Sequence, residues 1–204
     1  FNAVDDKIKD NTFKKSLRVY TETVPRNCLF VEQFTGQGCP NCPGGAKAMA
    51  AAIEELADPN KAIWVAHHTY YTDDFSLNES GTIADILGAN FAPACNINRA
   101  PREYGKGVDL IWHPGYATKA ILEAALAEPG LATMAITRSY NADTRELSVE
   151  VKGRSLDKEA YITAIVTQSG NTSIPITFAS ASVKRVDESV IIRTIMLPFY
   201  LTCM

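Results

Sequence analysis

Two cysteines stand three positions apart, in the sequence Cys39-Pro40-Asn41-Cys42. An apolar run typical of a buried strand precedes them and is broken by Thr35-Gly36-Gln37-Gly38, and an Ala-rich segment with helical spacing follows. This order predicts that Cys39 lies at the amino-terminal end of a helix, where the helix dipole and free backbone N–H groups stabilise a thiolate. Cys42 is then one helical turn away, within reach for a disulfide.

The chemistry that this arrangement predicts is thiol–disulfide exchange. Cys39 is the expected nucleophile, because only a thiolate attacks a disulfide, and Cys42 is the expected resolving thiol. Pro40 suits the first turn of the helix, where its missing N–H leaves no bond unmade.

Two other roles for the cysteine pair stay open. A zinc site usually needs about four ligands and a second Cys-x-x-Cys pair, which the sequence lacks. Cys95 with His67, His68 or His113 would have to complete a mixed site. A purely structural bridge is the stronger alternative, although closing so short a loop removes little chain entropy. We expect no metal and no cofactor.

The elements that position the pair follow the order strand, helix, strand, helix, in an α/β domain. The expected elements are strands over 28–34, 62–66 and 108–112, a strand that begins after Pro93, and helices over 43–57, 80–90 and 116–127. Proline at the start of a strand is tolerated, whereas inside a central strand it would remove a ladder hydrogen bond.

Beyond Gly130 apolar and polar residues alternate, which is typical of half-buried strands. Such runs lie at 134–140, 146–153, 160–168, 174–184 and 190–197, with a hairpin turn over 141–144. We therefore expect three regions: a polar lead-in over 1–27 with an edge strand near 17–21, an α/β domain over 28–130 and a small antiparallel β-sandwich over 131–204.

Composition excludes several classes of protein. The 204 residues are 46% hydrophobic and 21% charged, which is typical of a globular protein with a sizeable core. The formal charge of −3 leaves no cationic surplus for a nucleic acid. Runs such as 62–66 are too short to span a membrane as a helix. Since the chain begins at Phe1, we expect any targeting peptide to have been cut away or to lie outside this sequence.

A longer motif carries a family resemblance. The sequence Val31-Glu32-Gln33-Phe34-Thr35-Gly36-Gln37-Gly38-Cys39-Pro40-Asn41-Cys42-Pro43, together with Ile97-Asn98-Arg99, resembles the Omp28-related outer-membrane or surface lipoproteins of Bacteroidetes, over about residues 28–128. The resemblance implies a thioredoxin-like domain followed by an immunoglobulin-like β domain. It also implies export to the cell envelope, periplasm or outer-membrane surface, with a lipid anchor upstream of Phe1 as the one membrane contact.

The resemblance assigns a role to a proline as well. Cys39 and Cys42 match the redox pair of thioredoxin-like folds, and Pro93 matches the cis-proline that faces it. Pro101 is the rival, but it lies after the expected strand rather than before it. The implied partner is a protein thiol or disulfide of the cell envelope.

The predicted substrate-binding positions surround this site. A cis X-Pro bond turns the preceding backbone toward the cysteines, where it can pair with an extended substrate chain. The positions are Ala92, Gly38, Pro40 and Asn41.

Two departures from the thioredoxin pattern weaken the catalytic interpretation. Gln33 stands where thioredoxins carry a buried carboxylate, and Glu32 lies on the opposite strand face, so a proton acceptor for Cys42 is not obvious. Gly38 replaces the usual aromatic residue before the first cysteine. The competing hypothesis is therefore a non-enzymatic surface module, in which the thioredoxin-like half is a scaffold and the β domain binds protein or glycan.

The other cysteines and histidines are expected to be structural. Cys95 is predicted to fill the core. His67 and His68 are predicted to be hydrogen-bonded, with at most one of them facing the cysteines, because adjacent strand residues point to opposite faces. His113 is expected in a turn, and the segment 70–75 either lines a binding rim or covers a helix end.

Overall fold

The computed structural model of the chain describes residues 19–141, 143–144, 146–156, 161–162, 165, 183–184 and 190–196. Its first part contains β1 (Leu29–Thr35), α1 (Cys42–Glu54), η2 (Pro59–Lys61), β2 (Ala62–His68), α2 (Asn78–Leu87), β3 (Ala94–Ile97), β4 (Arg102–Glu103), β5 (Val108–Asp109), η3 (Pro114–Tyr116) and α3 (Lys119–Ala127). The second part contains β6 (Ala132–Asn141), β7 (Glu146–Ser155), β8 (Tyr161–Ile162), β9 (Val183–Lys184) and β10 (Val190–Met196).

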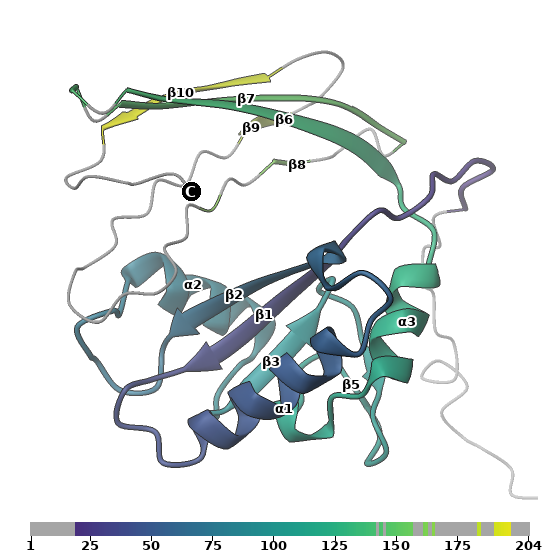
Figure 1. The fold of residues 1–204 in the computed structure, drawn as a ribbon, viewed down its shortest axis with the longest axis vertical. Coiled ribbons are helices and arrows are strands. Elements are labelled where there is room, and N and C mark those ends of the chain that lie inside the picture. The colour runs from purple at the N-terminus through teal and green to yellow at the C-terminus, as the bar shows by residue number, and fades with distance from the viewer. Residues whose placement is uncertain are drawn as a thin grey trace, which may run out of the picture.

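A three-stranded mixed sheet in the order β2-β1-β3 organises the first part. β1 is parallel to β2 and antiparallel to β3, so it has a neighbour on both sides. Figure 1 shows α1 and α3 covering one face of this sheet and α2 covering the other. The central position of β1 explains its mostly apolar sequence, because both of its faces are covered.

The two faces of the sheet carry separate cores. On the α1 and α3 face, Val31 and Cys95 pack with helix residues that include Met49 and Leu122. The opposite face has a smaller core, which contains Phe34, Ala94 and Ala84. Successive residues of β1 therefore alternate between the two cores, as the pleat of a strand requires.

Trp112 lies in the loop after β5 and packs into the larger core. It is 1% exposed, and its backbone exchanges two hydrogen bonds with Cys95. Its indole stacks on Tyr104 at a centroid distance of 5.6 Å. The expected strand over 108–112 is accordingly shorter, since β5 ends at Asp109 and only this isolated bridge continues the pairing.

Other element boundaries differ from the prediction as well: α1 ends at Glu54 rather than at 57, β2 extends to His68 rather than 66, and α2 spans Asn78–Leu87 rather than 80–90. The third helix begins at Lys119 rather than near 116, because residues Pro114–Tyr116 form a 3-10 turn and the Thr118 hydroxyl accepts a hydrogen bond from the Ile121 N–H. Residues 19–21 form no strand, and the rest of the expected edge strand lies outside the described residues.

In the second part, β6 and β7 form an antiparallel hairpin, and β10 pairs with β7 in a sheet of order β10-β7-β6. Asn141 stabilises the turn, because its side-chain oxygen accepts hydrogen bonds from the N–H groups of Asp143 and Thr144. β8 and β9 form a separate two-stranded pair.

An immunoglobulin-like sandwich is not established by these strands, and much of the expected runs at 160–168 and 174–184 falls outside the described part of the chain. The division into domains stays a prediction. Within the part of the chain that the structure describes, no helix combines the length and the apolar character needed to cross a membrane.

Candidate functional site

The cysteine pair forms a disulfide between the end of β1 and the start of α1. The Cys39 and Cys42 sulfur atoms are 2.04 Å apart, and their Cα atoms are 5.4 Å apart. Two backbone hydrogen bonds between residues three positions apart shape the loop: the Cys39 N–H donates to the Gly36 carbonyl, and the Cys42 N–H donates to the Cys39 carbonyl. The turn itself therefore presents one sulfur to the other.

The position of Cys39 relative to the helix differs from the prediction. Helix α1 begins at Cys42 with Asn41 as its N-cap, so Cys39 lies in the turn that precedes the helix. Pro40 belongs to that turn as well, and Pro43 is the proline of the first helical turn. The helix dipole consequently acts directly on Cys42 and reaches Cys39 from one turn further away.

The bridge is almost completely buried. Cys39 and Cys42 are each only 4% exposed, whereas Gly38, Pro40 and Asn41 are exposed. The peptide around the bridge is therefore at the surface while the disulfide faces inward. A partner that reacts with Cys39 must contact the exposed neighbours first.

Pro93 follows a cis peptide bond to the half-buried Ala92, at the position that the resemblance indicated. Pro101, the rival, lies immediately before β4. Pro93 packs against the beginning of α1: a Cβ built on Gly45 would lie 2.9 Å from Pro93 Cγ and 2.8 Å from Pro114 Cγ. The helix that starts at Cys42 therefore rests on two proline rings.

Gly45 gives a direct test of this close packing. Alanine at position 45 would improve helix propensity by about 1 kcal/mol, but its methyl group would meet two rigid rings and cost about 1–3 kcal/mol in overpacking. We expect Gly45→Ala to lower the free energy of unfolding by about 1 kcal/mol in urea titrations. Gly44→Ala is the matched control, because a Cβ there meets nothing within 4 Å, and it should leave stability unchanged or raised. Equal effects of the two variants would contradict the packing argument.

No carboxylate was expected beside Cys42, and the strand register explains why. Gln33 is paired with Cys95 on the α1 face of the sheet, and both side chains are buried. Glu32 points to the α2 face instead. Within the described residues the Gln33 side-chain oxygen has no hydrogen-bond partner. Burial raises the pKa of the Cys95 thiol, which keeps it neutral and suits the predicted role in the core.

A buried charge network on the α2 face was not predicted from the sequence. Arg99 donates two hydrogen bonds to the Glu32 carboxylate, at 2.8 and 2.7 Å. His67 Nε2 lies 3.3 Å from Glu32 Oε1 without the alignment of a hydrogen bond, and its Nδ1 lies 3.1 Å from the Ser80 hydroxyl of α2. A glutamate inside an apolar strand was the available signal, because a buried carboxylate requires a partner.

The residues Ile97-Asn98-Arg99 form a turn at the end of β3, which places Arg99 beside Glu32. Asn98 and Arg99 both have positive φ, at 57° and 50°. The Asn98 side-chain oxygen accepts from the Phe30 N–H, and the Asn98 N–H donates to the Phe30 carbonyl. The motif that supported the resemblance therefore fastens β3 to β1 and leaves the disulfide on the other side of the sheet.

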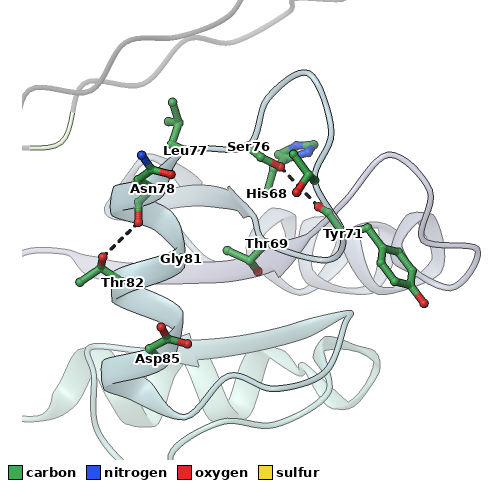
Figure 2. Close-up of a pocket in the computed structure, with 10 residues that line it drawn as sticks. His68, Thr69, Tyr71, Ser76, Leu77, Asn78, Gly81, Thr82 and Asp85 are labelled. Atoms are coloured by element: carbon green, nitrogen blue, oxygen red, sulfur yellow. Dashed lines mark hydrogen bonds between the residues drawn. The ribbon is translucent and has the colours of Figure 1, made fainter.

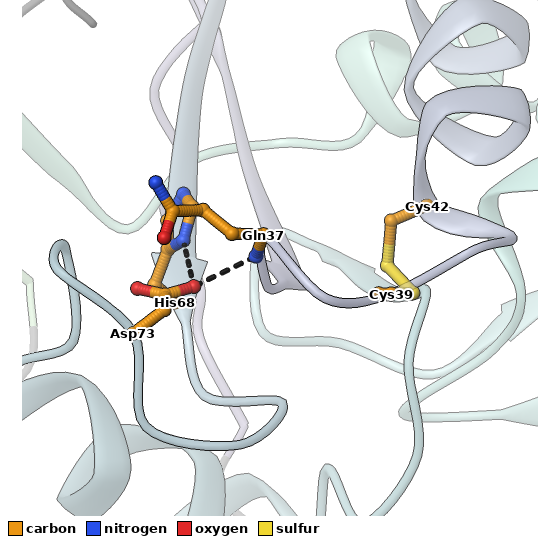
Figure 3. The surroundings of a disulfide bond; sticks show 5 residues. All are labelled: Gln37, Cys39, Cys42, His68 and Asp73. Atoms are coloured by element: carbon orange, nitrogen blue, oxygen red, sulfur yellow. Dashed lines mark hydrogen bonds and ion pairs between the residues drawn. A yellow bond between two sulfur atoms is a disulfide. The ribbon is translucent and has the colours of Figure 1, made fainter.

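A second charged group lies close to the cysteine loop. Asp73 Oδ2 accepts a hydrogen bond from the Gln37 backbone N–H and is bonded to His68 Nδ1, both at 2.7 Å (Figure 3). His67 and His68 are thus both hydrogen-bonded, as predicted, and point to opposite faces. His113 lies in a turn, where its Nδ1 accepts from the Gly115 N–H.

A polar cavity of about 430 Å³ opens beside His68, between the loop after β2 and helix α2 (Figure 2). Tyr71 and Thr72 line it together with Asn78, Thr82 and other polar residues. Two residues of the segment 70–75 therefore line a cavity, and the expected role of this segment at a binding rim stays a prediction. Across the described ranges, no group of three or more histidine, cysteine or acidic residues is placed to hold a metal.

No protein-family model matches the chain, and no curated protein is detectably similar to it. Among solved structures, HBP35 of Porphyromonas gingivalis is similar, with a TM-score of 0.51 and 18% sequence identity. The match covers 66% of this chain and 44% of HBP35, so the chain spans less than half of that neighbour. The likeness shows a thioredoxin-like fold for the matched part.

Proposed function

We propose that the chain is a thiol–disulfide oxidoreductase of the bacterial cell envelope, with Cys39 as nucleophile and Cys42 as resolving thiol. The observation that carries the proposal is the Cys39–Cys42 disulfide, which immediately precedes a helix seated on Pro93. A thiol pair at this place in a thioredoxin-like fold has the reach and the electrostatic environment for exchange.

The exchange from the observed oxidised form has two steps. A thiolate of a partner dithiol attacks the Cys39 sulfur, the Cys39–Cys42 bond breaks, and Cys42 leaves as a thiolate that takes up a proton. The partner's second thiolate then attacks the partner sulfur atom that is bonded to Cys39, a disulfide forms within the partner, the bond to Cys39 breaks, and Cys39 leaves as a thiolate. The partner has lost two electrons to the cysteine pair, and the reverse sequence reduces a partner disulfide.

The envelope location and the kind of partner rest on similarity. The Omp28-related motif implies an exported, lipid-anchored protein, and the structural neighbour comes from Porphyromonas gingivalis, a member of Bacteroidetes. The proposed partner is a protein whose extended chain lies along the exposed residues Gly38, Pro40 and Asn41 and the backbone of Ala92.

Trapping of a mixed disulfide tests the proposal. Besides the bridge and Cys95, the sequence has two further cysteines, Cys28 and Cys203, which serine replaces in the test protein. In this background we expect Cys42→Ser to form a covalent adduct with a disulfide-containing protein such as insulin, because the resolving thiol is missing. Nonreducing electrophoresis and mass spectrometry identify the adduct and its attachment to Cys39. The matched control adds Cys39→Ser, which should form none. Adduct formation in this control, or its absence in Cys42→Ser, would overturn the proposal.

Two observations favour the non-enzymatic alternative. The 4% exposure of Cys39 is typical of a closed structural bridge, and the nearest strand positions offer no carboxylate to Cys42. In that case the thioredoxin-like part is a scaffold, and binding resides elsewhere. A Cys42→Ser chain that is folded and traps nothing would support this alternative.

A further inference from the structure

The carboxylate of Asp73 joins the loop that carries Cys39 to the end of β2. Its Oδ2 atom accepts the Gln37 N–H and contacts His68 Nδ1, and its Oδ1 atom accepts the Phe75 N–H at 2.9 Å. Gln37 stands two positions before Cys39 in the chain. Figure 3 shows the carboxylate between the imidazole and the loop that leads to the disulfide. One side chain thus connects the backbone of Gln37, the imidazole of His68 and the backbone of its own loop.

The environment of Asp73 keeps it charged. Its side chain is only 8% exposed. Burial alone would raise the pKa of this carboxyl, but the hydrogen bonds from His68, Gln37 and Phe75 outweigh burial and hold the pKa below its ordinary value. A hydrogen bond to an ionised acceptor is stronger than one to a neutral acceptor, so the bond to Gln37 is a firm restraint.

Backbone contacts with the segment after β2 also restrain the loop that leads to Cys39. The N–H groups of Thr69 and Tyr70 both donate to the Thr35 carbonyl, at 2.9 and 3.0 Å. A Cβ on Gly36 would lie 2.3 Å from the Tyr70 carbonyl oxygen, so the two backbones are in direct contact. Residues 35–37 are consequently bound to the segment after β2 at each successive position, and Asp73 supplies the contact nearest to Cys39.

We propose that Asp73, oriented by His68, is the positioning residue that holds Cys39 at bonding distance from Cys42. The proposal rests on the function proposed above, since positioning matters only where the pair exchanges. Two effects act in the same direction. The restraint keeps the sulfurs close, which favours the disulfide over the dithiol, and a negative charge near the loop disfavours a thiolate. Loss of the Asp73 carboxylate should therefore make the bridge easier to reduce.

The test is a redox equilibrium of the full chain in a Cys28→Ser, Cys203→Ser background. The protein is equilibrated with graded ratios of reduced to oxidised glutathione, and the Cys39–Cys42 thiols are counted by alkylation and mass spectrometry. We expect Asp73→Ala to raise the equilibrium constant for reduction about tenfold, the amount that one charge-assisted hydrogen bond provides.

Two variants separate positioning from other effects. Asp74→Ala removes the same charge from an exposed neighbour in the same loop and should shift the constant less than about twofold. Asp73→Asn keeps an oxygen that accepts the Gln37 N–H and should restore the constant to within about threefold of the parent. A shift in Asp74→Ala equal to that in Asp73→Ala, or no shift in a folded Asp73→Ala chain, would overturn the proposal.

The outcome is independent of the trapping experiment, because glutathione replaces the protein partner. If the chain traps no protein but Asp73→Ala shows the shift, the proposed function is wrong and the positioning contact stands. If the chain traps protein but Asp73→Ala shows no shift, the proposed function stands and the positioning proposal is wrong. If circular dichroism shows that Asp73→Ala does not fold, His68→Ala takes its place. It removes the group that orients the carboxylate and should shift the constant in the same direction by about threefold. An unchanged constant there also contradicts the proposal.

Discussion

Replacing Cys39 with serine is expected to lower the rate of insulin reduction by dithiothreitol to that of the uncatalysed reaction, a loss of at least about 100-fold. The serine hydroxyl does not ionise at neutral pH and forms no disulfide, so both the attacking group and the covalent intermediate disappear. The rate is measured by the turbidity of the precipitating insulin B chain, with protein concentration as the variable.

Cys28→Ser is the matched control for this experiment. Cys28 is an exposed free thiol immediately before β1, at the opposite end of that strand from the bridge, and its replacement should leave the rate unchanged. A Cys39→Ser chain as active as the parent would place the chemistry on another thiol. A parent chain with no activity above the uncatalysed rate would leave the disulfide with a structural role.

The second large effect is expected for Glu32→Leu, which should lower the free energy of unfolding by about 3 kcal/mol. The substitution leaves the cation of Arg99 and the buried imidazole of His67 without their carboxylate. Because the Arg99 side chain is 41% exposed and can turn toward water, we expect the lower end of the usual range for a broken buried pair. Chemical denaturation followed by circular dichroism measures the difference. Glu123→Gln is the control, since its pair with Lys119 is exposed on both sides and should contribute less than about 0.5 kcal/mol.

The effect of Glu32 should also depend on pH. Burial alone would raise the pKa of the Glu32 carboxyl, but Arg99 and His67 outweigh burial and hold the pKa below its ordinary value. A group whose pKa is lower in the folded state stabilises the protein above its unfolded pKa and loses that contribution as the pH falls through its folded pKa. The stability difference between the parent and Glu32→Leu should therefore be full at pH 7 and shrink in acid. A difference that grows as the pH falls would contradict this assignment.

Local patterns in the sequence were sufficient to predict much of the candidate site. The spacing of Cys39 and Cys42, a broken apolar strand before them and a helical segment after them were sufficient to predict where a disulfide forms. The place of Pro93 before a short strand followed from the same order of elements. The helix predicted over 43–57 begins at Cys42, but Pro40, which was expected in its first turn, lies in the turn before it, because Pro40 and Pro43 both suit a first turn and the sequence does not distinguish them.

Contacts between distant segments were beyond the same reasoning. Glu32 and Arg99 are far apart in the chain, and only the pairing of β1 with β3 brings them together. The bond between Asp73 and Gln37 joins two loops, where no periodicity exists to constrain the chain. Alternation predicted the strands β6 and β7, but it describes one face of one strand and does not say which strands pair, so it could not establish a sandwich.

The burial of Trp112 has an optical consequence. The chain has two tryptophans, and the other, Trp64, is 37% exposed on β2. The intrinsic fluorescence of the protein therefore contains one emitter in a dry environment under helix α1 and one in contact with water on the other strand edge. Blue-edge emission reports selectively on the packing beneath the helix that begins at Cys42, without any attached dye.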